Sequence, residues 1–211
     1  MDGTLAHVPT LAALAERSQS ALMIDDAHGF GLPYAAASRG HQPQSDIYIA
    51  TLGKAIGCAG AFVTGSEELI DYLTSFARTF GFSTALPPVI AAAALAAVDY
   101  IESNPSHAHV LTQHIHDFGV AMTDQGWLTC PSQTAIVPLV IGDEAQTLAL
   151  ADQLKQRGIW ATAIRPPTVK PGTCRIRITL SSAHTQAHIE QLITILGQLK
   201  RVNAHNLGDL R

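Results

Sequence analysis

The sequence predicts an α/β protein with two domains, and three observations support this fold class. Two short apolar runs, residues 21–24 and 47–50, have the composition of buried strands, and polar or glycine-rich residues follow each of them. The later part of the chain alternates strand and helix patterns, which is typical of a small α+β domain. An Asn-Pro pair at residues 104–105 separates the two parts. The expected division is a first domain over residues 1–104, a second over residues 105–200 and a tail over residues 201–211.

The first domain is expected to alternate helices with short strands. Ser66 has the side chain of a helix cap, and Glu67 and Glu68 place acidic groups in the first turn after it. Pro87 and Pro88 fit a helix start, because proline lacks the amide hydrogen that a first turn leaves unpaired. The expected elements are a helix over residues 4–20, strands over 21–24, 47–50 and 60–64, a helix over 66–76, a loop over 78–86 and a helix over 87–103.

The second domain is expected to pack one sheet against helices. Its last strand alternates strictly, so that Cys174, Ile176 and Ile178 face one way and Arg175 and Arg177 face the other. The expected elements are a helix over residues 106–124, a strand over 135–141, a helix over 144–157, strands over 159–164 and 174–180 and a helix over 185–199.

Histidines recur on the helix expected over residues 106–124. His107 with His114, and His109 with His116, share faces at seven-residue spacing, which suggests metal binding. No carboxylate completes a ligand set, however, and a solvated polar face explains the pattern better. We therefore expect no metal site here.

The composition excludes several classes of partner. Of the 211 residues 47% are hydrophobic and 14% charged, a balance typical of globular proteins with a core. The net charge of -4 provides no basic field, so we expect neither nucleic acid nor an anionic membrane as a partner. Three cysteines without a C-x-x-C pair indicate a reducing compartment, which we take to be the cytoplasm. No signal peptide or transmembrane helix is expected.

Lys54 follows the strand expected over residues 47–50 and is surrounded by small and apolar neighbours. Open α/β sheets keep their chemistry at the carboxyl ends of their strands. Desolvation in such surroundings favours the neutral, nucleophilic amine, so the sequence predicts a buried reactive lysine. A solvated loop lysine is the alternative.

Two carboxylates and a histidine follow the other early strand: Asp25, Asp26 and His28. Desolvating such groups costs several kcal/mol unless they are paired, so we expect a cationic or hydrogen-bonding partner. A solvated turn remains the alternative, since Gly29 and Gly31 favour a loop.

These side chains together match what pyridoxal 5'-phosphate (PLP) requires of a protein. Lys54 would bind the aldehyde, Asp25 would keep the ring nitrogen protonated, and His28 would reach the ring oxygen. Thr51, with glycine amides, would donate to the phosphate.

Four motifs carry a resemblance to a known family: DDAHG at residues 25–29, TLGKAIG at 51–57, FSTALPP at 82–88 and IRPPTV at 164–169. They resemble the α-oxoamine synthases, a family of PLP enzymes, and the similarity runs from residue 1 to about residue 199. It implies a fold-type-I, aminotransferase-like architecture: the C-terminal part of a large PLP domain and a small α+β C-terminal domain. It also implies a homodimer with active sites at the subunit interface.

Within this family the motifs are most similar to the biotin-pathway members, which condense L-alanine with a pimeloyl thioester of acyl carrier protein or coenzyme A. The resemblance implies that Lys54 is the Schiff-base lysine and proton carrier, Asp25 the pyridinium partner and His28 the ring-oxygen ligand. It further implies phosphate contacts for Thr51 and, in the neighbouring subunit, for Ser83 and Thr84, and substrate contacts for Thr168 and Arg177. A solvated or salt-bridged role for Arg177 remains open.

Family members carry further chain before the segment that matches Met1, including a glycine-rich phosphate turn and an aromatic side chain stacked on the pyridine ring. We therefore expect this sequence to be a fragment or a truncated product. Two alternatives stay open: a sister synthase that uses glycine or serine, and a cofactor-incompetent module that only dimerises or pairs with a complementary segment.

Overall fold

A computed structural model describes residues 2–34, 45–127, 129 and 132–208, with side chains as far as residue 200. The chain divides into two compact units. The N-terminal unit is Ala6–Ser106, and the C-terminal unit is His107–Arg211 together with Met1–Leu5. The assignment of residues 1–104 to a cofactor-binding domain stays a prediction.

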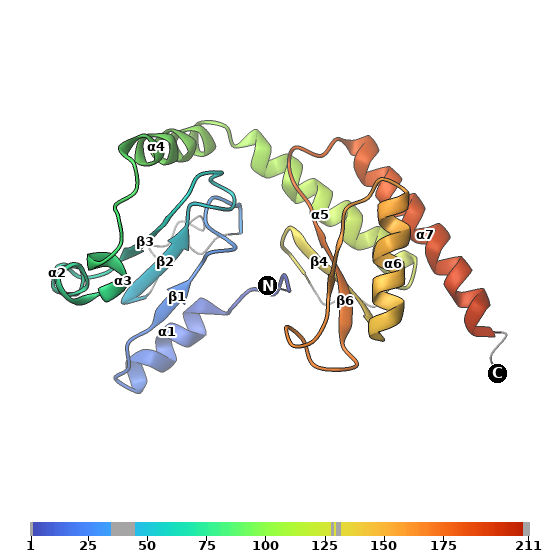
Figure 1. The fold of residues 1–211 in the computed structure, drawn as a ribbon, viewed down its shortest axis with the longest axis horizontal. Helices are drawn as coiled ribbons and strands as arrows, with labels where there is room; N and C mark the ends of the chain where they lie inside the picture. Colours follow the sequence, from blue (N-terminus) through green and yellow to red (C-terminus); the bar gives the residue numbers. More distant parts are fainter. Residues whose placement is uncertain (1, 35–44, 128, 130–131, 209–211) are drawn as a thin grey trace. The chain divides into compact units, whose positions relative to one another are not determined.

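The N-terminal unit contains a three-stranded sheet in the order β1-β2-β3 (Figure 1). Strand β1 runs parallel to β2, and β3 runs antiparallel to it. The elements are α1 (Val8–Arg17), β1 (Met23–Asp25), β2 (Ile47–Thr51), β3 (Ala61–Thr64), α2 (Glu67–Phe76), α3 (Arg78–Gly81) and α4 (Pro88–Ser103).

Some expectations for this unit are wrong. The segment expected to be a loop contains α3, because Phe80 and Gly81 donate their amides to the Ala77 carbonyl at 2.9 Å and close a helical turn. Strand β1, expected to be buried on both faces, leaves Met23 59% exposed. Strand β1 also lies at the edge of the described sheet, with β2 on one side.

The predicted cap of α2 is confirmed. The Ser66 hydroxyl accepts a hydrogen bond from the Leu69 amide at 3.3 Å, and Glu67 and Glu68 occupy the first turn. Helix α4 begins at Pro88, as the proline pair predicts.

The C-terminal unit is an α+β structure around an antiparallel sheet in the order β4-β6-β5. Helix α6 packs against all three strands (Figure 1). The elements are α5 (Ser106–Asp124), β4 (Ile136–Gly142), α6 (Glu144–Gln156), β5 (Thr162–Ile164), β6 (Cys174–Thr179) and α7 (Gln186–Gly208). Helix α7 extends beyond Leu199, the residue at which we expected it to end.

The alternation predicted for β6 is confirmed, since Cys174, Ile176 and Ile178 are buried while Arg175 and Arg177 are only half-buried. The buried face of β6 belongs to a core that also includes Phe118 and Met122 of α5, Leu139 of β4, Leu154 of α6 and Leu196 of α7.

Burial is unequal between the units. In the described part of the N-terminal unit, α4 contributes one buried residue, Ala94, and α1, α2 and α3 contribute none. Large apolar side chains on these helices and the segments beside them are exposed instead, among them Tyr72, Phe76, Phe80, Phe82 and Val89.

The first residues of the chain belong to the C-terminal unit. The Gly3 carbonyl accepts hydrogen bonds from the hydroxyls of Ser132 and Thr134, each at 3.2 Å. Gly3 has a φ of +85°, and a Cβ there would collide with the Ile136 carbonyl. No sequence pattern predicts this contact, because it joins residues more than a hundred positions apart. None of the described helices combines the length and apolarity needed to cross a bilayer.

Candidate active site

The parallel strands β1 and β2 end at the same edge of the N-terminal sheet. Asp25 pairs with Ile49 in the strand register, and the Asp26 amide donates to the Ile49 carbonyl at 2.8 Å. The turn after β1 and the loop after β2 therefore leave the sheet side by side, where the sequence predicted a site.

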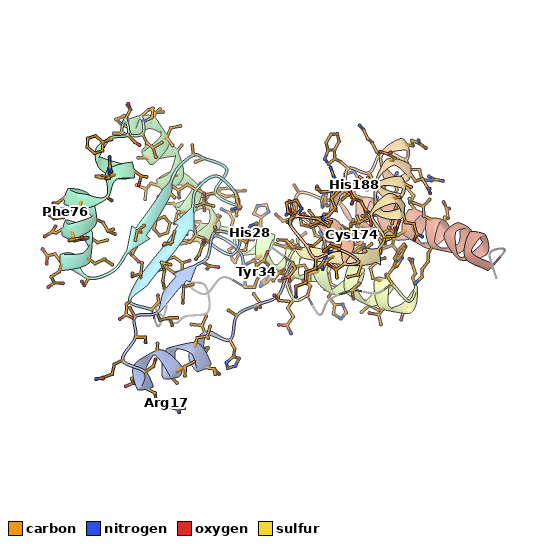
Figure 2. The ribbon with its side chains drawn as sticks, turned by 60° about the horizontal axis from the view of Figure 1, so that its bottom comes forward. Arg17, His28, Tyr34, Phe76, Cys174 and His188 are labelled. Carbon is orange, nitrogen blue, oxygen red and sulfur yellow. The ribbon has the colours of Figure 1, made fainter. Side chains whose placement is uncertain are left out.

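The turn after β1 is closed by its own backbone. Asp25 Oδ1 accepts from the Ala27 amide at 3.0 Å, and the Asp26 carbonyl accepts from the amides of Gly29 and Phe30, both at 3.0 Å. Asp25 is exposed, and His28 is half-buried just beyond the end of β1 (Figure 2). The predicted turn thus presents both side chains from a compact framework.

We expected a cationic or hydrogen-bonding partner for the carboxylates after β1, and Asp26 has such a partner. The Tyr48 hydroxyl donates to Asp26 Oδ2 at 2.9 Å. Tyr48 is 4% exposed. Its burial, followed by the hydrogen bond to the Asp26 carboxylate, raises the pKa of the Tyr48 phenol. One sequence feature could have indicated this pair, namely a tyrosine within an apolar strand. A buried phenol needs a polar partner.

Lys54 lies on a closed loop between β2 and β3. The Leu52 amide donates to the Gly60 carbonyl at 2.9 Å, and the Cys58 amide donates to the Leu52 carbonyl at 2.8 Å. Ile56 is 5% exposed and fixes the loop to the core. Lys54 itself is exposed, so the expectation of a buried lysine is wrong for this structure. Its apolar neighbour Ile56 turns inward, and Lys54 is left on the outside of the loop.

Thr51 closes the same loop through its side chain. Its hydroxyl donates to the Gly60 carbonyl at 3.1 Å and accepts from the Gly53 amide at 3.3 Å. The hydroxyl proton of Thr51 is therefore used within the loop that carries Lys54.

The turn with His28 packs against the loop with Lys54. A Cβ built at Gly31 would lie 3.0 Å from Ile56 Cδ1 and 3.4 Å from the Ala55 Cβ. Phe30 and Phe62 of β3 meet edge to face with ring centroids 4.9 Å apart. The structure thus brings Asp25, His28, Thr51 and Lys54 to one edge of the sheet on two loops that touch.

Ser83 and Thr84 are exposed on the segment between α3 and α4. Leu86 of this segment lies against Gly60 at the mouth of the Lys54 loop, where a Cβ on Gly60 would collide with the Leu86 side chain. The segment therefore passes beside the Lys54 loop.

Thr168 and Arg177 belong to the C-terminal unit. Arg177 lies on the central strand β6, between Pro138 of β4 and Thr162 of β5. Among the described side chains and backbone groups, none forms a hydrogen bond or ion pair with its guanidinium, which disfavours the salt-bridged alternative. Thr168 is exposed in the turn after β5, where its amide donates to the Arg165 carbonyl at 3.0 Å.

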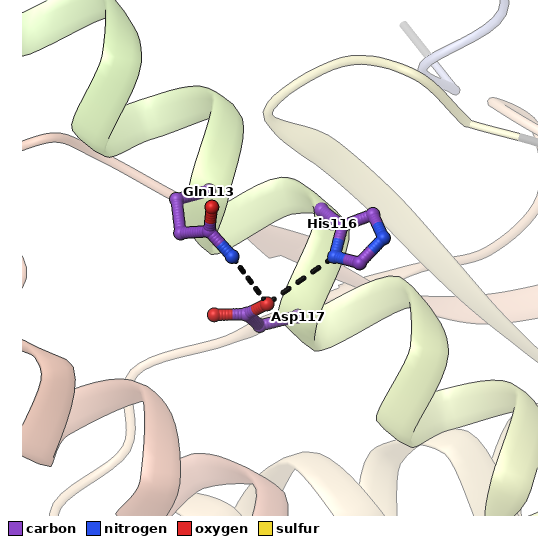
Figure 3. A network of polar contacts seen from close by, with 3 residues as sticks. All are labelled: Gln113, His116 and Asp117. Carbon is purple, nitrogen blue, oxygen red and sulfur yellow. Dashed lines mark hydrogen bonds and ion pairs between the residues drawn. The ribbon is translucent and has the colours of Figure 1, made fainter.

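The histidines of α5 do not form a metal site in the part of the chain that the structure describes. His116 Nδ1 contacts Asp117 Oδ1 at 3.2 Å, and the same oxygen accepts from Gln113 Nε2 at 2.7 Å (Figure 3). His114 does not fit the solvated face that we expected, because it is 4% exposed with its Nδ1 3.3 Å from the Ser181 carbonyl.

Comparison with known proteins adds a family and several relatives. Residues 1–196 match the family model described as aminotransferase class I and II. The 8-amino-7-oxononanoate synthase of Delftia acidovorans is 40% identical over 215 residues, which cover 96% of this chain and 53% of that protein. The chain thus spans about half the length of the curated relatives it matches.

Two solved structures are also similar. The 8-amino-7-oxononanoate synthase of Francisella tularensis is 28% identical with a TM-score of 0.78, over 92% of this chain and 59% of that one. The serine palmitoyltransferase of Sphingomonas wittichii is 22% identical with a TM-score of 0.89, over 97% of this chain and 53% of that one.

Proposed function

Because this chain belongs to the aminotransferase class I and II family, we propose that it acts as a PLP-dependent 8-amino-7-oxononanoate synthase. The family match and the structural likenesses confirm the predicted fold-type-I, aminotransferase-like α/β class. The proposed reaction joins L-alanine to a pimeloyl thioester of acyl carrier protein or coenzyme A and releases carbon dioxide and the free thiol. Relatives named for this synthase, 40% and 45% identical to the chain, support this choice over a sister synthase.

One observation carries the proposal. The turn with Asp25 and His28 and the loop with Lys54 leave neighbouring strands at the same edge and touch through Gly31 and Ile56. These two loops, which contact each other, carry a carboxylate, an imidazole and an amine. Groups of these kinds hold the ring and the aldehyde of PLP.

The side chains present fit PLP. Within the described residues, the Lys54 amine has no hydrogen-bonding partner, so it is available to hold the aldehyde carbon. Asp25 uses Oδ1 for the Ala27 amide, and Oδ2 remains for the pyridinium nitrogen. His28 would contact the ring oxygen. Thr51 would contact the phosphate from the base of the Lys54 loop, which its hydroxyl closes through the Gly60 carbonyl.

Each residue has a distinct task in the proposed reaction. When bound, PLP supplies an electron sink for negative charge at the α-carbon of the amino acid. The Asp25 carboxylate keeps a proton on the ring nitrogen by charge pairing. Lys54 Nζ takes up and returns protons at the α-carbon, which its exposed position on a short loop permits. Arg177 would bind the substrate carboxylate through two parallel hydrogen bonds, and Thr168 would help to orient it.

We further propose that the protein works as a homodimer in the cytoplasm. Ser83 and Thr84 would then contact the phosphate bound by the neighbouring subunit, and their exposure leaves them available for that contact. The thiols of Cys58 and Cys174 are free, which is consistent with a reducing compartment.

A turnover assay tests the proposal. The protein is incubated with PLP, pimeloyl-CoA and either L-alanine, glycine or L-serine, and the released thiol is measured. We expect thiol release with L-alanine in wild type and none in Lys54→Ala. Turnover with glycine or L-serine in preference to L-alanine would indicate a sister synthase instead.

A second candidate function is an interaction module without cofactor. The exposed aromatic residues of α2, α3 and the segment before α4 favour it, because several large apolar side chains exposed on one part of a chain are typical of association sites. Co-expression with the preceding segment of a relative distinguishes the two candidates. Restored turnover that requires Lys54 supports the synthase, and a stable complex that never binds PLP supports the module.

A further inference from the structure

We propose that Asp26 and Tyr48 form a positioning pair that holds the turn carrying Asp25 and His28 against the end of β2. The inference rests on the proposed function only in assigning PLP to that turn. The hydrogen-bonding geometry of the pair stands independently of any ligand.

The pair joins two elements that carry different parts of the site. Tyr48 is on β2, whose next residues lead to Thr51 and the Lys54 loop, while Asp26 begins the turn after β1. In the strand register Tyr48 lies beside Ile24, so its hydroxyl reaches past the end of β1 to Asp26 Oδ2 at 2.9 Å. The contact therefore fixes the turn at the point where the strand pairing stops.

The Asp26 carboxylate is also enclosed from the turn side. A Cβ built at Gly29 would collide with Asp26 Oδ1, and Gly29 is buried. The close approach of Asp26 therefore favours glycine at position 29, and backbone conformation does not, since its φ lies outside the left-handed region. The carboxylate lies between the Tyr48 hydroxyl and the Gly29 backbone.

Backbone bonds transmit the position of Asp26 to its neighbours. Its amide donates to the Ile49 carbonyl at 2.8 Å, and its carbonyl accepts from Gly29 and Phe30 at 3.0 Å. Asp25 directly precedes Asp26, and His28 directly precedes Gly29. A shift of the Asp26 carboxylate therefore moves both side chains assigned to PLP, although neither Asp26 nor Tyr48 needs to touch it.

The test compares Tyr48→Phe, Asp26→Ala and their double variant with wild type by two measurements: amide hydrogen exchange at Gly29 and Phe30, and the PLP dissociation constant. The matched control is Tyr72→Phe, which removes a hydroxyl from a tyrosine that is 60% exposed on α2. Asp26→Asn is the conservative rescue, because its amide oxygen still accepts from Tyr48.

We expect Tyr48→Phe and Asp26→Ala each to speed exchange at the two amides by about tenfold, the loss that fits one hydrogen bond. The double variant should match Asp26→Ala alone, while exchange within α4 stays unchanged. The same variants should weaken PLP binding several-fold, whereas Asp26→Asn and Tyr72→Phe should leave both readouts close to wild type.

Wild-type exchange rates in Tyr48→Phe, or additive effects in the double variant, would overturn the positioning role. If wild type binds no PLP, the proposed cofactor function fails, but the exchange measurement still decides whether the pair fixes the turn. Altered exchange with unchanged PLP affinity would mean that the pair stabilises the turn without positioning cofactor ligands, which also contradicts the proposal.

Discussion

The Leu52 amide and the Gly60 carbonyl are joined by a 2.9 Å hydrogen bond that closes the loop carrying Lys54. The Thr51 hydroxyl reaches the same carbonyl at 3.1 Å, so two donors from one strand end fix the base of the loop. Lys54 is exposed, yet the backbone that presents it is held at both ends. A lysine that must approach a bound ligand benefits from such preorganisation.

Thr51→Val should loosen this loop. The substitution removes the hydrogen bond to Gly60 while nearly preserving side-chain volume, so we expect a loss of about 1 kcal/mol in the free energy of unfolding and weaker PLP binding. Thr51→Ser keeps the hydroxyl and serves as the control. Urea denaturation and a PLP titration measure both effects, and equal stability of the valine and serine variants would contradict the loop-closing role.

Alanine substitutions at Gly31 and Gly57 test the contact between the two site loops, with Gly57→Ala as the matched control. Both have positive φ, +81° and +69°, so alanine at either position should cost about 1 kcal/mol of backbone strain. At Gly31 the new Cβ would also lie 3.0 Å from Ile56 Cδ1, whereas at Gly57 nothing lies within 4 Å. Gly31→Ala should therefore be the more destabilising and should weaken PLP binding more. The reverse order, measured by urea denaturation, would exclude the packing of the loops described above.

The start of α7 should gain stability from His188→Glu. The Thr185 hydroxyl accepts from the His188 amide at 3.3 Å, and His188 Nδ1 accepts from the Thr185 amide at 3.2 Å, which is the reciprocal arrangement of a capping box. Glutamate keeps both bonds and adds negative charge at the helix N-terminus, so we expect about 0.5 kcal/mol of stabilisation. Thermal unfolding at pH 7.5 measures it, with His188→Ala as the destabilised control.

Stability should fall as the pH falls below about 6.5. Burial, followed by the nearby His188 and His114, lowers the pKa of His184 from its ordinary 6.5. The unfolded chain therefore binds more protons than the folded one between the ordinary and the lowered pKa. The stabilising contribution is present above pH 6.5 and is lost as the pH drops toward the folded-state pKa.

This dependence is checked by urea denaturation at pH 7.5 and 5.5. His184→Asn keeps an acceptor for the Ser181 amide, which donates to Nδ1 of His184 at 3.1 Å, and removes the titration. We expect a smaller stability difference between the two pH values in that variant. His116→Asn, at a side chain 72% exposed, should retain the full difference.

Arg177→Lys should separate substrate binding from folding. Lysine keeps the charge but loses the paired hydrogen-bond donors, so the KM for L-alanine should rise about tenfold while the free energy of unfolding stays within about 0.5 kcal/mol of wild type. Arg175→Lys is the comparison, because Arg175 Nε already donates to the Thr173 carbonyl at 3.0 Å. An unchanged KM in Arg177→Lys would remove Arg177 from the substrate site.

Local patterns predicted much of this architecture. The Ser66 cap, the Pro88 helix start and the alternation along β6 follow from propensities that act within a few residues, and the structure confirms each of them. The shared edge of β1 and β2 was predictable as well, because parallel neighbours end together.

The failures concern side-chain directions within a loop and contacts between distant residues. Hydrophobic neighbours of Lys54 suggested burial, but Ile56 alone turns into the core, and the direction of each side chain depends on the closed loop. The pairing of Asp26 with Tyr48 spans 22 positions, and the pairing of Gly3 with Ser132 spans 129. Periodicity in the sequence does not predict contacts of this kind.

Borohydride reduction of the protein in the presence of PLP, followed by peptide mapping, tests directly whether Lys54 holds the cofactor. We expect a visible absorbance band that reduction abolishes, with the pyridoxyl group recovered on the peptide containing Lys54 and absent in Lys54→Ala. Labelling of wild type that is spread over exposed lysines such as Lys155 and Lys170 and is unchanged by Lys54→Ala would contradict it.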